Sequence, residues 1–146
     1  MTFAEVLDGS YRYPSRYFVA KDGICSELVC SDTTEKSVEL ARSLAESNDS
    51  QSPGVAIAYD SALRFQNEKF DAVMVEMQAF GSSAIRCVVA LPYLKRDGGE
   101  LTTYRPKILV IEHMTQHEAG MVFDAFFSWF TSSERAYSRW KAAYVG

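Results

Sequence analysis

Apolar and polar positions alternate between Val55 and His113 in four runs that are separated by short turn signals. Joining residues 70–80 to residues 84–94 across the loop Gly81-Ser82-Ser83 sets apolar side chains opposite one another on one face. The apolar pairs on this core face are Ala79 with Ile85, Met77 with Cys87, Val75 with Val89, and Val73 with Leu91. The opposite, second face is mixed in polarity, because it pairs Gln78 with Arg86 and Glu76 with Val88.

Residues 55–66 admit two interpretations. Their alternation favours a strand, whereas a Ser-Pro start followed by apolar residues at three- and four-residue steps would suit a helix. We favour the strand, since a loop over residues 67–69 then pairs Tyr59 with Met77. This strand would complete a four-stranded antiparallel meander, and the helix remains the alternative.

The last strand of the meander is expected to return across a loop over residues 97–100. That loop length pairs Val89 with Ile108 and Cys87 with Val110, again apolar with apolar. The meander therefore keeps its core face over all four strands.

An N-terminal hairpin is predicted by the Asp-Gly turn between the apolar runs 17–20 and 24–30. A helix over residues 33–46 follows, with Asp32 as its N-cap and Glu35 placed to complete a capping box. A short helix is also expected over residues 2–8.

After His113 the period changes from two to about 3.6, which predicts that a long helix follows the last strand. Large aromatic residues recur along one stripe of this helix, so we expect it to pack across the core face. They are Phe123, Phe126, Phe130, Tyr137, Trp140 and Tyr144.

Together these elements predict one α+β domain over residues 1–146. Its antiparallel sheet joins the N-terminal hairpin to the four-stranded meander, and is packed by the aromatic C-terminal helix and the helix over 33–46. The element order resembles that of profilin-like and roadblock-like domains, and a curved sheet around a long terminal helix is similar to the helix-grip fold. These are likenesses of layout, and they assign no residue a role.

Composition narrows the class of partner. The net charge of -4 offers no global positive field for nucleic acid or anionic membrane, so we expect neither as a partner. A basic hairpin arm is the feature that could still touch nucleic acid, and it carries Lys95, Arg96, Arg105 and Lys107. No leader or membrane-spanning pattern is visible, and the three cysteines are expected to be free thiols, so a cytoplasmic location is the default expectation.

Candidate chemistry is sparse along the chain. His113 and His117 are four residues apart, but Met114 follows the first histidine where a zinc-protease motif needs glutamate. The serines near Gly81 lie in a hairpin turn, and the acidic Asp97-Gly98-Gly99-Glu100 segment does not fit a phosphate loop. We expect no catalytic, metal or cofactor-binding site, and an enzyme is the less favoured class.

The first functional hypothesis is a non-enzymatic interaction module, either homodimeric or binding a protein partner. Its surface would be the second face of the sheet, because a half-apolar face without an evident cover is typical of an interface. The residues expected there are Met74, Arg86, Val88, Leu109 and Ile111.

The alternative hypothesis is a small-molecule-binding protein or a modest enzyme. Its pocket would lie between the core face and the C-terminal helix, where aromatic side chains can surround a ligand. The residues expected to line it are Tyr59, Met77, Phe123, Phe126 and Phe130.

Overall fold

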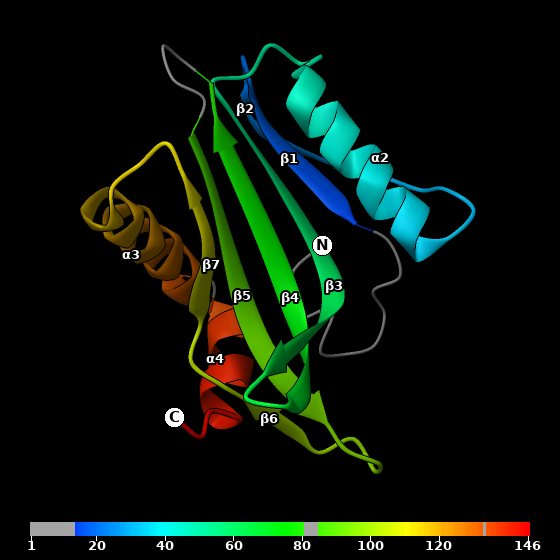
Figure 1. Ribbon diagram of the computed structural model, residues 1–146, viewed down its shortest axis with the longest axis vertical. Coiled ribbons are helices and arrows are strands. Elements are labelled where there is room, and N and C mark those ends of the chain that lie inside the picture. Colours follow the sequence, from blue (N-terminus) through cyan, green and yellow to red (C-terminus); the bar gives the residue numbers. More distant parts are fainter. Residues whose placement is uncertain (1–13, 81–84, 133) are drawn as a thin grey trace.

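The computed structural model describes residues 14–80, 85–132 and 134–146, with side chains except at 126, 127, 129–132, 135 and 136. The chain forms a curled antiparallel sheet with helices on either side of it (Figure 1). This arrangement confirms the predicted α+β class. The short helix expected over residues 2–8 lies outside the described residues.

Over the described residues the sheet has seven strands, and all pairings between these strands are antiparallel. The strand order is β2-β1-β3-β4-β5-β6, with β7 also paired to β5. The N-terminal hairpin therefore continues the meander through the pairing of β1 with β3. The strands are β1 (Ser15–Ala20), β2 (Gly23–Leu28), β3 (Gly54–Phe65), β4 (Glu68–Ala79), β5 (Ile85–Lys95), β6 (Leu101–Thr103) and β7 (Lys107–Glu112).

Three helices are described: α2 (Thr34–Ser47), α3 (Gln116–Ser132) and α4 (Glu134–Ala142). The expected long C-terminal helix is therefore two successive helices. The cap of α2 also differs by one residue from the prediction, because Thr33 rather than Asp32 is the N-cap. The Thr33 hydroxyl accepts a hydrogen bond of 3.2 Å from the backbone N–H of Lys36.

Replacing Thr33 by alanine is expected to lower the free energy of unfolding by about 1 kcal/mol, since the capping acceptor is lost. Asp32 offers a matched comparison, because its side chain is 85% exposed and, among the described residues, forms an ion pair with Lys36 alone. Asp32→Ala is expected to cost less than about 0.5 kcal/mol. Urea denaturation followed by circular dichroism measures both values. If Asp32→Ala lowered the free energy of unfolding as much as Thr33→Ala, the assignment of Thr33 as the N-cap would be contradicted.

The predicted register of the central hairpin is confirmed. β4 and β5 pair Met77 with Cys87 and Glu76 with Val88, as the alternation of apolar residues required. At this hairpin the core face and the second face therefore consist of the residues that the sequence predicted.

The strand interpretation of residues 55–66 is also confirmed, but its predicted register is wrong. Gln66 and Asn67 form a two-residue turn in which both φ angles are positive, at 49° and 66°. Tight hairpin turns of this kind match the twist of the flanking strands. Tyr59 consequently pairs with Met74 rather than Met77. The shift is an odd number of residues, so Tyr59 lies on the second face instead of the core face.

The predicted pairing of Cys87 with Val110 is wrong as well. Val89 pairs with Ile108 as expected, but the register shifts between Val88 and Val89, so that Cys87 pairs with Ile111. Leu109 is the extra residue of this β-bulge. The bulge moves Ile111 to the core face.

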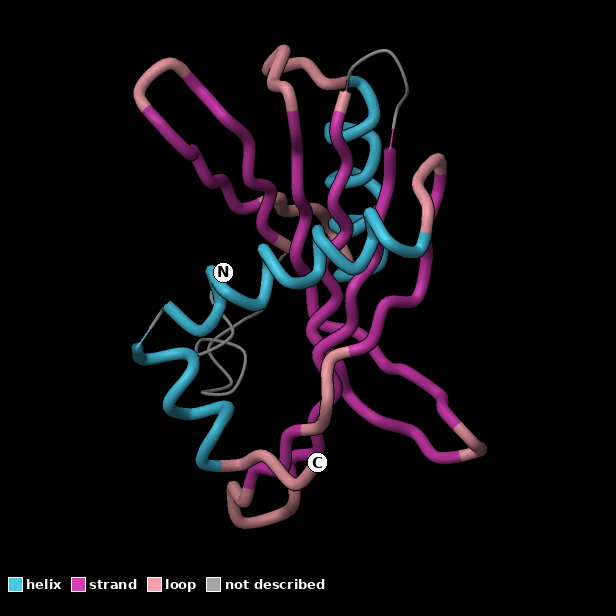
Figure 2. The backbone as a smooth tube through the Cα atoms, turned by 90° about the vertical axis from the view of Figure 1, so that its left-hand side faces the viewer, coloured by secondary structure: helices cyan, strands magenta, loops and turns pink. Residues whose placement is uncertain are grey.

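Side chains are buried on both faces of the sheet. On the second face, α2 packs Val38, Ala41 and Ala45 into a cluster with Val55 and Ile57 of β3. The core face buries a further set, which comprises Val73, Cys87, Val89, Leu91 and Tyr93. Figures 1 and 2 show α3 crossing the strands on the side away from α2.

The C-terminal end of the described chain is tied to β6 by backbone and side-chain hydrogen bonds. The Thr103 hydroxyl donates to the Trp140 carbonyl at 2.8 Å, and the Thr103 N–H donates to the Ala143 carbonyl at 2.8 Å. Trp140 is 6% exposed and lies 4.5 Å from Tyr144, measured between ring centroids. Trp140 of α4 thus contributes to the core near Thr103, as the aromatic stripe predicted in part.

Candidate functional site

A buried carboxylate lies on the second face, where α2 meets the sheet. Glu76 of β4 is 3% exposed, and its Oε1 atom accepts hydrogen bonds from Arg42 at 2.6 and 2.9 Å and from the Tyr59 hydroxyl at 2.6 Å. Its Oε2 atom accepts a bond of 3.1 Å from Arg86. Four hydrogen bonds therefore reach this carboxylate, three at Oε1 and one at Oε2, where a carboxylate offers about four acceptor positions.

The electrostatics of this network favour an ionised Glu76. Burial by itself raises the pKa of the carboxyl group, but the hydrogen bonds from Arg42, Tyr59 and Arg86 outweigh it and lower the pKa below its usual value. Burial and the neighbouring carboxylate raise the pKa of Tyr59 to about 12, so its hydroxyl keeps its proton. The network has no free base or acid at neutral pH, and its chemistry is that of a structural ion-pair cluster.

The network extends to the edge formed by β7. Arg86 also donates to Glu112 at 3.1 Å, and the side chains of Arg86 and Glu112 are 29% and 48% exposed. The polar residues of the second face therefore connect α2, β3, β4, β5 and β7 in one chain of hydrogen bonds.

The predicted interaction surface is divided by these contacts. Met74 packs against the α2 cluster, Val88 is only 3% exposed, and Arg86 belongs to the Glu76 network. Leu109 is 40% exposed at the bulge, while Ile111 faces the core side. The five residues do not form one continuous exposed patch, since α2 covers part of the face on which three of them lie.

The predicted pocket residues are also distributed. Tyr59 faces α2 and Met77 lies on the opposite face of the sheet, as the register of β3 with β4 requires. Phe123 is half-buried on α3, whereas the side chains of Phe126 and Phe130 lie outside the described residues. The structure does not bring Tyr59 and Met77 into one pocket.

A second polar pair lies on the core face. The Tyr93 hydroxyl donates to Oδ1 of Asp60 at 2.8 Å, and Tyr93 is 5% exposed. Burial raises the pKa of Asp60, and burial together with Asp60 raises the pKa of Tyr93. The two groups satisfy each other, so the pair explains how a carboxylate is accommodated on an apolar face.

Metal-ligating residues do not converge in the part of the chain that the structure describes. Over residues 14–80, 85–132 and 134–146, no three His, Cys, Asp or Glu side chains are grouped as a metal ion would require. His113 follows β7 with a positive φ of 58°, and the exposed His117 lies in the first turn of α3. Among the described helices none is long and apolar enough to cross a membrane.

The edge strand β2 is the most exposed of the described helices and strands. All six residues of β2 are exposed, and within the described chain β2 pairs with β1 alone. Its apolar residues Ile24 and Leu28 are 74% and 64% exposed, and they share the core face with Val19 of β1, which is 44% exposed. These three residues and the unpaired side of β2 are named the β2 edge.

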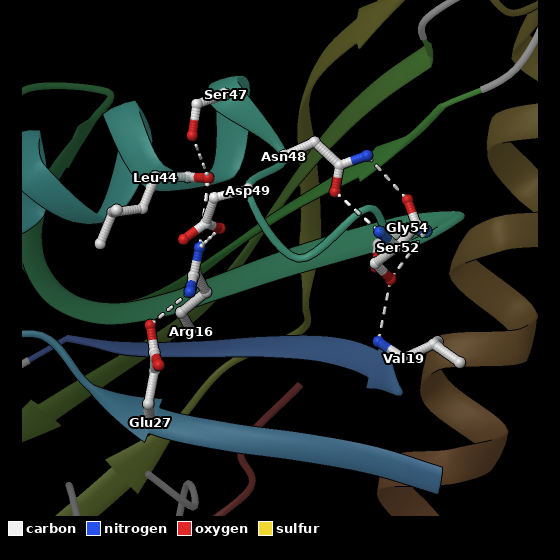
Figure 3. A network of polar contacts seen from close by, with 9 residues as sticks. All are labelled: Arg16, Val19, Glu27, Leu44, Ser47, Asn48, Asp49, Ser52 and Gly54. Atoms are coloured by element: carbon white, nitrogen blue, oxygen red, sulfur yellow. Dashed lines mark hydrogen bonds and ion pairs between the residues drawn. The ribbon is translucent and has the colours of Figure 1, made fainter. Parts of the chain in front are cut away.

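The inner side of the same hairpin is firmly anchored (Figure 3). Arg16 is 4% exposed and forms ion pairs with Glu27 at 2.6 Å and with Asp49 beyond the end of α2. The Ser52 hydroxyl accepts a bond of 2.9 Å from the backbone N–H of Val19. The β2 edge is therefore presented by a hairpin whose other face is held in place.

Sequence reasoning located this hairpin but did not identify it as an edge. The only available signal was negative, since residues 23–28 contain no proline and no lysine, the usual protections of an exposed edge. Strand order depends on distant pairings, which the local pattern does not encode.

Comparison of the chain with protein-family models, with curated protein sequences and with solved structures found no significant match in any of the three.

Proposed function

We propose that this protein is a non-enzymatic interaction module that forms a homodimer through its β2 edge. The observation that carries the proposal is a six-residue strand in which every residue is exposed and whose outer side has no strand partner among the described residues. An unpaired strand edge offers a row of backbone donors and acceptors to another strand. The proposal keeps the class expected from the sequence and assigns it to a different surface.

The absence of edge protection supports pairing. The only charged side chain of β2 is Glu27, which is held by Arg16 of the neighbouring strand. Because Arg16 and Ser52 already fix the hairpin, little conformational entropy remains to be lost on binding.

A second copy of the chain is the occupant that the side chains favour. A two-fold axis perpendicular to the sheet pairs two β2 strands antiparallel and keeps each face on its own side. Centring that axis on Ser26 sets Ile24 opposite Leu28 of the second copy, and the reverse pair follows by symmetry. The two most exposed apolar residues of β2 then cover one another.

Alternative symmetric registers are less favourable. An axis centred on Cys25 would set Ile24 opposite Ser26, and would place Leu28 opposite the charged Asp22 of the turn. The axis centred on Ser26 instead sets Cys25 opposite Glu27, with no like charges in direct contact. We therefore assign the dimer the Ser26-centred register.

The double variant Ile24→Lys/Leu28→Lys is expected to raise the dimer dissociation constant at least about tenfold, since apolar pairs become like-charge pairs. Pairing of one short strand buries little area, so the wild-type dimer should be weak and concentration-dependent. Sedimentation equilibrium over a concentration series measures both constants. Leu40→Lys is the matched control, because Leu40 is 42% exposed on α2 and away from the β2 edge.

A cysteine placed on the axis tests the register. In a Cys25→Ser/Cys30→Ser background, Ser26→Cys is expected to form a disulfide between copies under mild oxidation, because directly opposed strand residues have suitable Cα separations. A wild-type chain that stays monomeric at high concentration would refute the dimer. If the Ile24→Lys/Leu28→Lys variant dimerised as tightly as the wild type, the β2 edge would not be the dimer interface.

A further inference from the structure

A second surface feature lies at the other end of β3, near its turn with β4. A pocket of about 220 Å³ opens there between the β3–β4 hairpin and the segment that connects β6 to β7. Leu63, Phe70 and Pro92 supply apolar surface to it. None of the residues of the β2 edge lines this pocket, so it stands independently of the dimer.

Aromatic rings shape the walls of the pocket. The rings of Phe70 and Tyr104 meet edge to face, with centroids 5.1 Å apart and planes inclined by 76°. This packing fixes Tyr104 directly before the strand-interrupting residues Arg105 and Pro106. Tyr104, which forms one wall of the pocket, is thus held in place by the Phe70 ring of β4 as well as by its own loop.

Two cations stand at the rim beside these rings. Lys107 has its ammonium group 3.9 Å from the centroid of the Phe65 ring, and Arg105 is exposed. No carboxylate in the described parts of the chain lies within ion-pair distance of either cation. Glu68, Gln66 and Gly146 complete the lining. Within the described residues, Lys107 contacts the Phe65 ring and neither cation is neutralised by a carboxylate, so both can donate hydrogen bonds to an anion.

We propose that this pocket binds a small organic carboxylate with a single aromatic ring or a branched apolar body. The apolar body would contact Phe70 and Tyr104, and the carboxylate would accept hydrogen bonds from Arg105 and Lys107. The volume is below the range of about 300–1,000 Å³ that is usual for drug-sized ligands, so a one-ring ligand is the upper size. The carboxylate of Glu68 on the rim disfavours ligands with several negative charges.

Titration of the ¹⁵N-labelled full chain with benzoate tests this proposal by NMR. Saturable shifts are expected for the amides of Leu63, Phe70 and Tyr104, with weaker binding of the neutral analogue benzamide. Arg105→Gln and Lys107→Gln are each expected to weaken benzoate binding about threefold to tenfold, since exposed charge-assisted hydrogen bonds are lost. Arg96→Gln, at the exposed tip of the next hairpin, is the matched control and should leave the affinity unchanged.

Three results would overturn the proposal. They are the absence of localised shifts with benzoate, equal affinity for benzamide and benzoate, and unchanged affinity in both glutamine variants whose spectra otherwise match the wild type. Repeating the titration on the Ile24→Lys/Leu28→Lys variant is expected to give the same affinity, which separates this site from the dimer.

Discussion

Replacing Glu76 by alanine is expected to lower the free energy of unfolding by about 3 kcal/mol. The substitution removes the carboxylate that accepts hydrogen bonds from Arg42, Tyr59 and Arg86. Breaking a buried pair leaves its partners without a counter-charge, and the cost is at the low end of the usual range because both guanidinium groups partly reach solvent. Urea denaturation of the two proteins at neutral pH measures the difference.

Glu112→Ala is the matched control for this result. Glu112 binds the same Arg86, but its side chain is 48% exposed, so its loss is expected to cost less than about 1 kcal/mol. Equal costs for the two alanine variants would show that burial of Glu76 adds nothing to the network.

The pH dependence of stability gives an independent readout of the same carboxylate. Hydrogen bonds hold the pKa of Glu76 lower in the folded chain than in the unfolded chain. The stabilisation is therefore complete above the unfolded-state pKa, and is lost as the pH falls through the folded-state pKa. Glu76→Gln should remove this acid-dependent part of the stability, so the difference between wild type and variant is expected to shrink in acid.

Replacing Ile57 by alanine is expected to lower the free energy of unfolding by about 2–5 kcal/mol. Ile57 is 2% exposed and belongs to the cluster that joins β3 to Val38 and Ala41 of α2. Truncation removes buried apolar area and leaves a cavity that the surrounding side chains fill only partly. The measurement is urea denaturation at a concentration where the chain is monomeric.

Ile24→Ala provides the same chemical change at an exposed position. Ile24 is 74% exposed, so the stability of the monomer is expected to change by less than about 0.5 kcal/mol. If both alanine variants are equally mild, α2 does not pack firmly on the second face of the sheet.

The central hairpin shows how much of the fold the sequence could predict. The register of β4 with β5 followed from a short loop and from alternation that separated apolar from mixed positions on both strands. Any register shifted by one residue would have moved the apolar side chains to the wrong face, so the pattern admitted one solution. The helix over 33–46 and the terminal aromatic stripe were predicted from the spacing of their apolar residues, which recur about every 3.6 positions.

The register of β3 and the pairing of β7 could not be predicted in the same way. The two-residue turn at Gln66 and Asn67 and the bulge at Leu109 each change register by local backbone geometry. Neither position has the glycine that usually marks such geometry. Both changes moved a candidate site residue to the other face: Tyr59 to the second face and Ile111 to the core face.

The sequence by itself determined the α+β class, the register of β4 with β5 and the helix near residues 33–46, because periodicity and loop length act between neighbouring elements. Only the tertiary structure decided which face α2 covers and which arginines balance the negative charge of Glu76. It also decided that β2 is the edge strand of the described sheet. It also brought Phe65, Tyr104 and Lys107 around one pocket. These features depend on contacts between residues distant in the chain, and a local pattern of polarity does not specify such contacts.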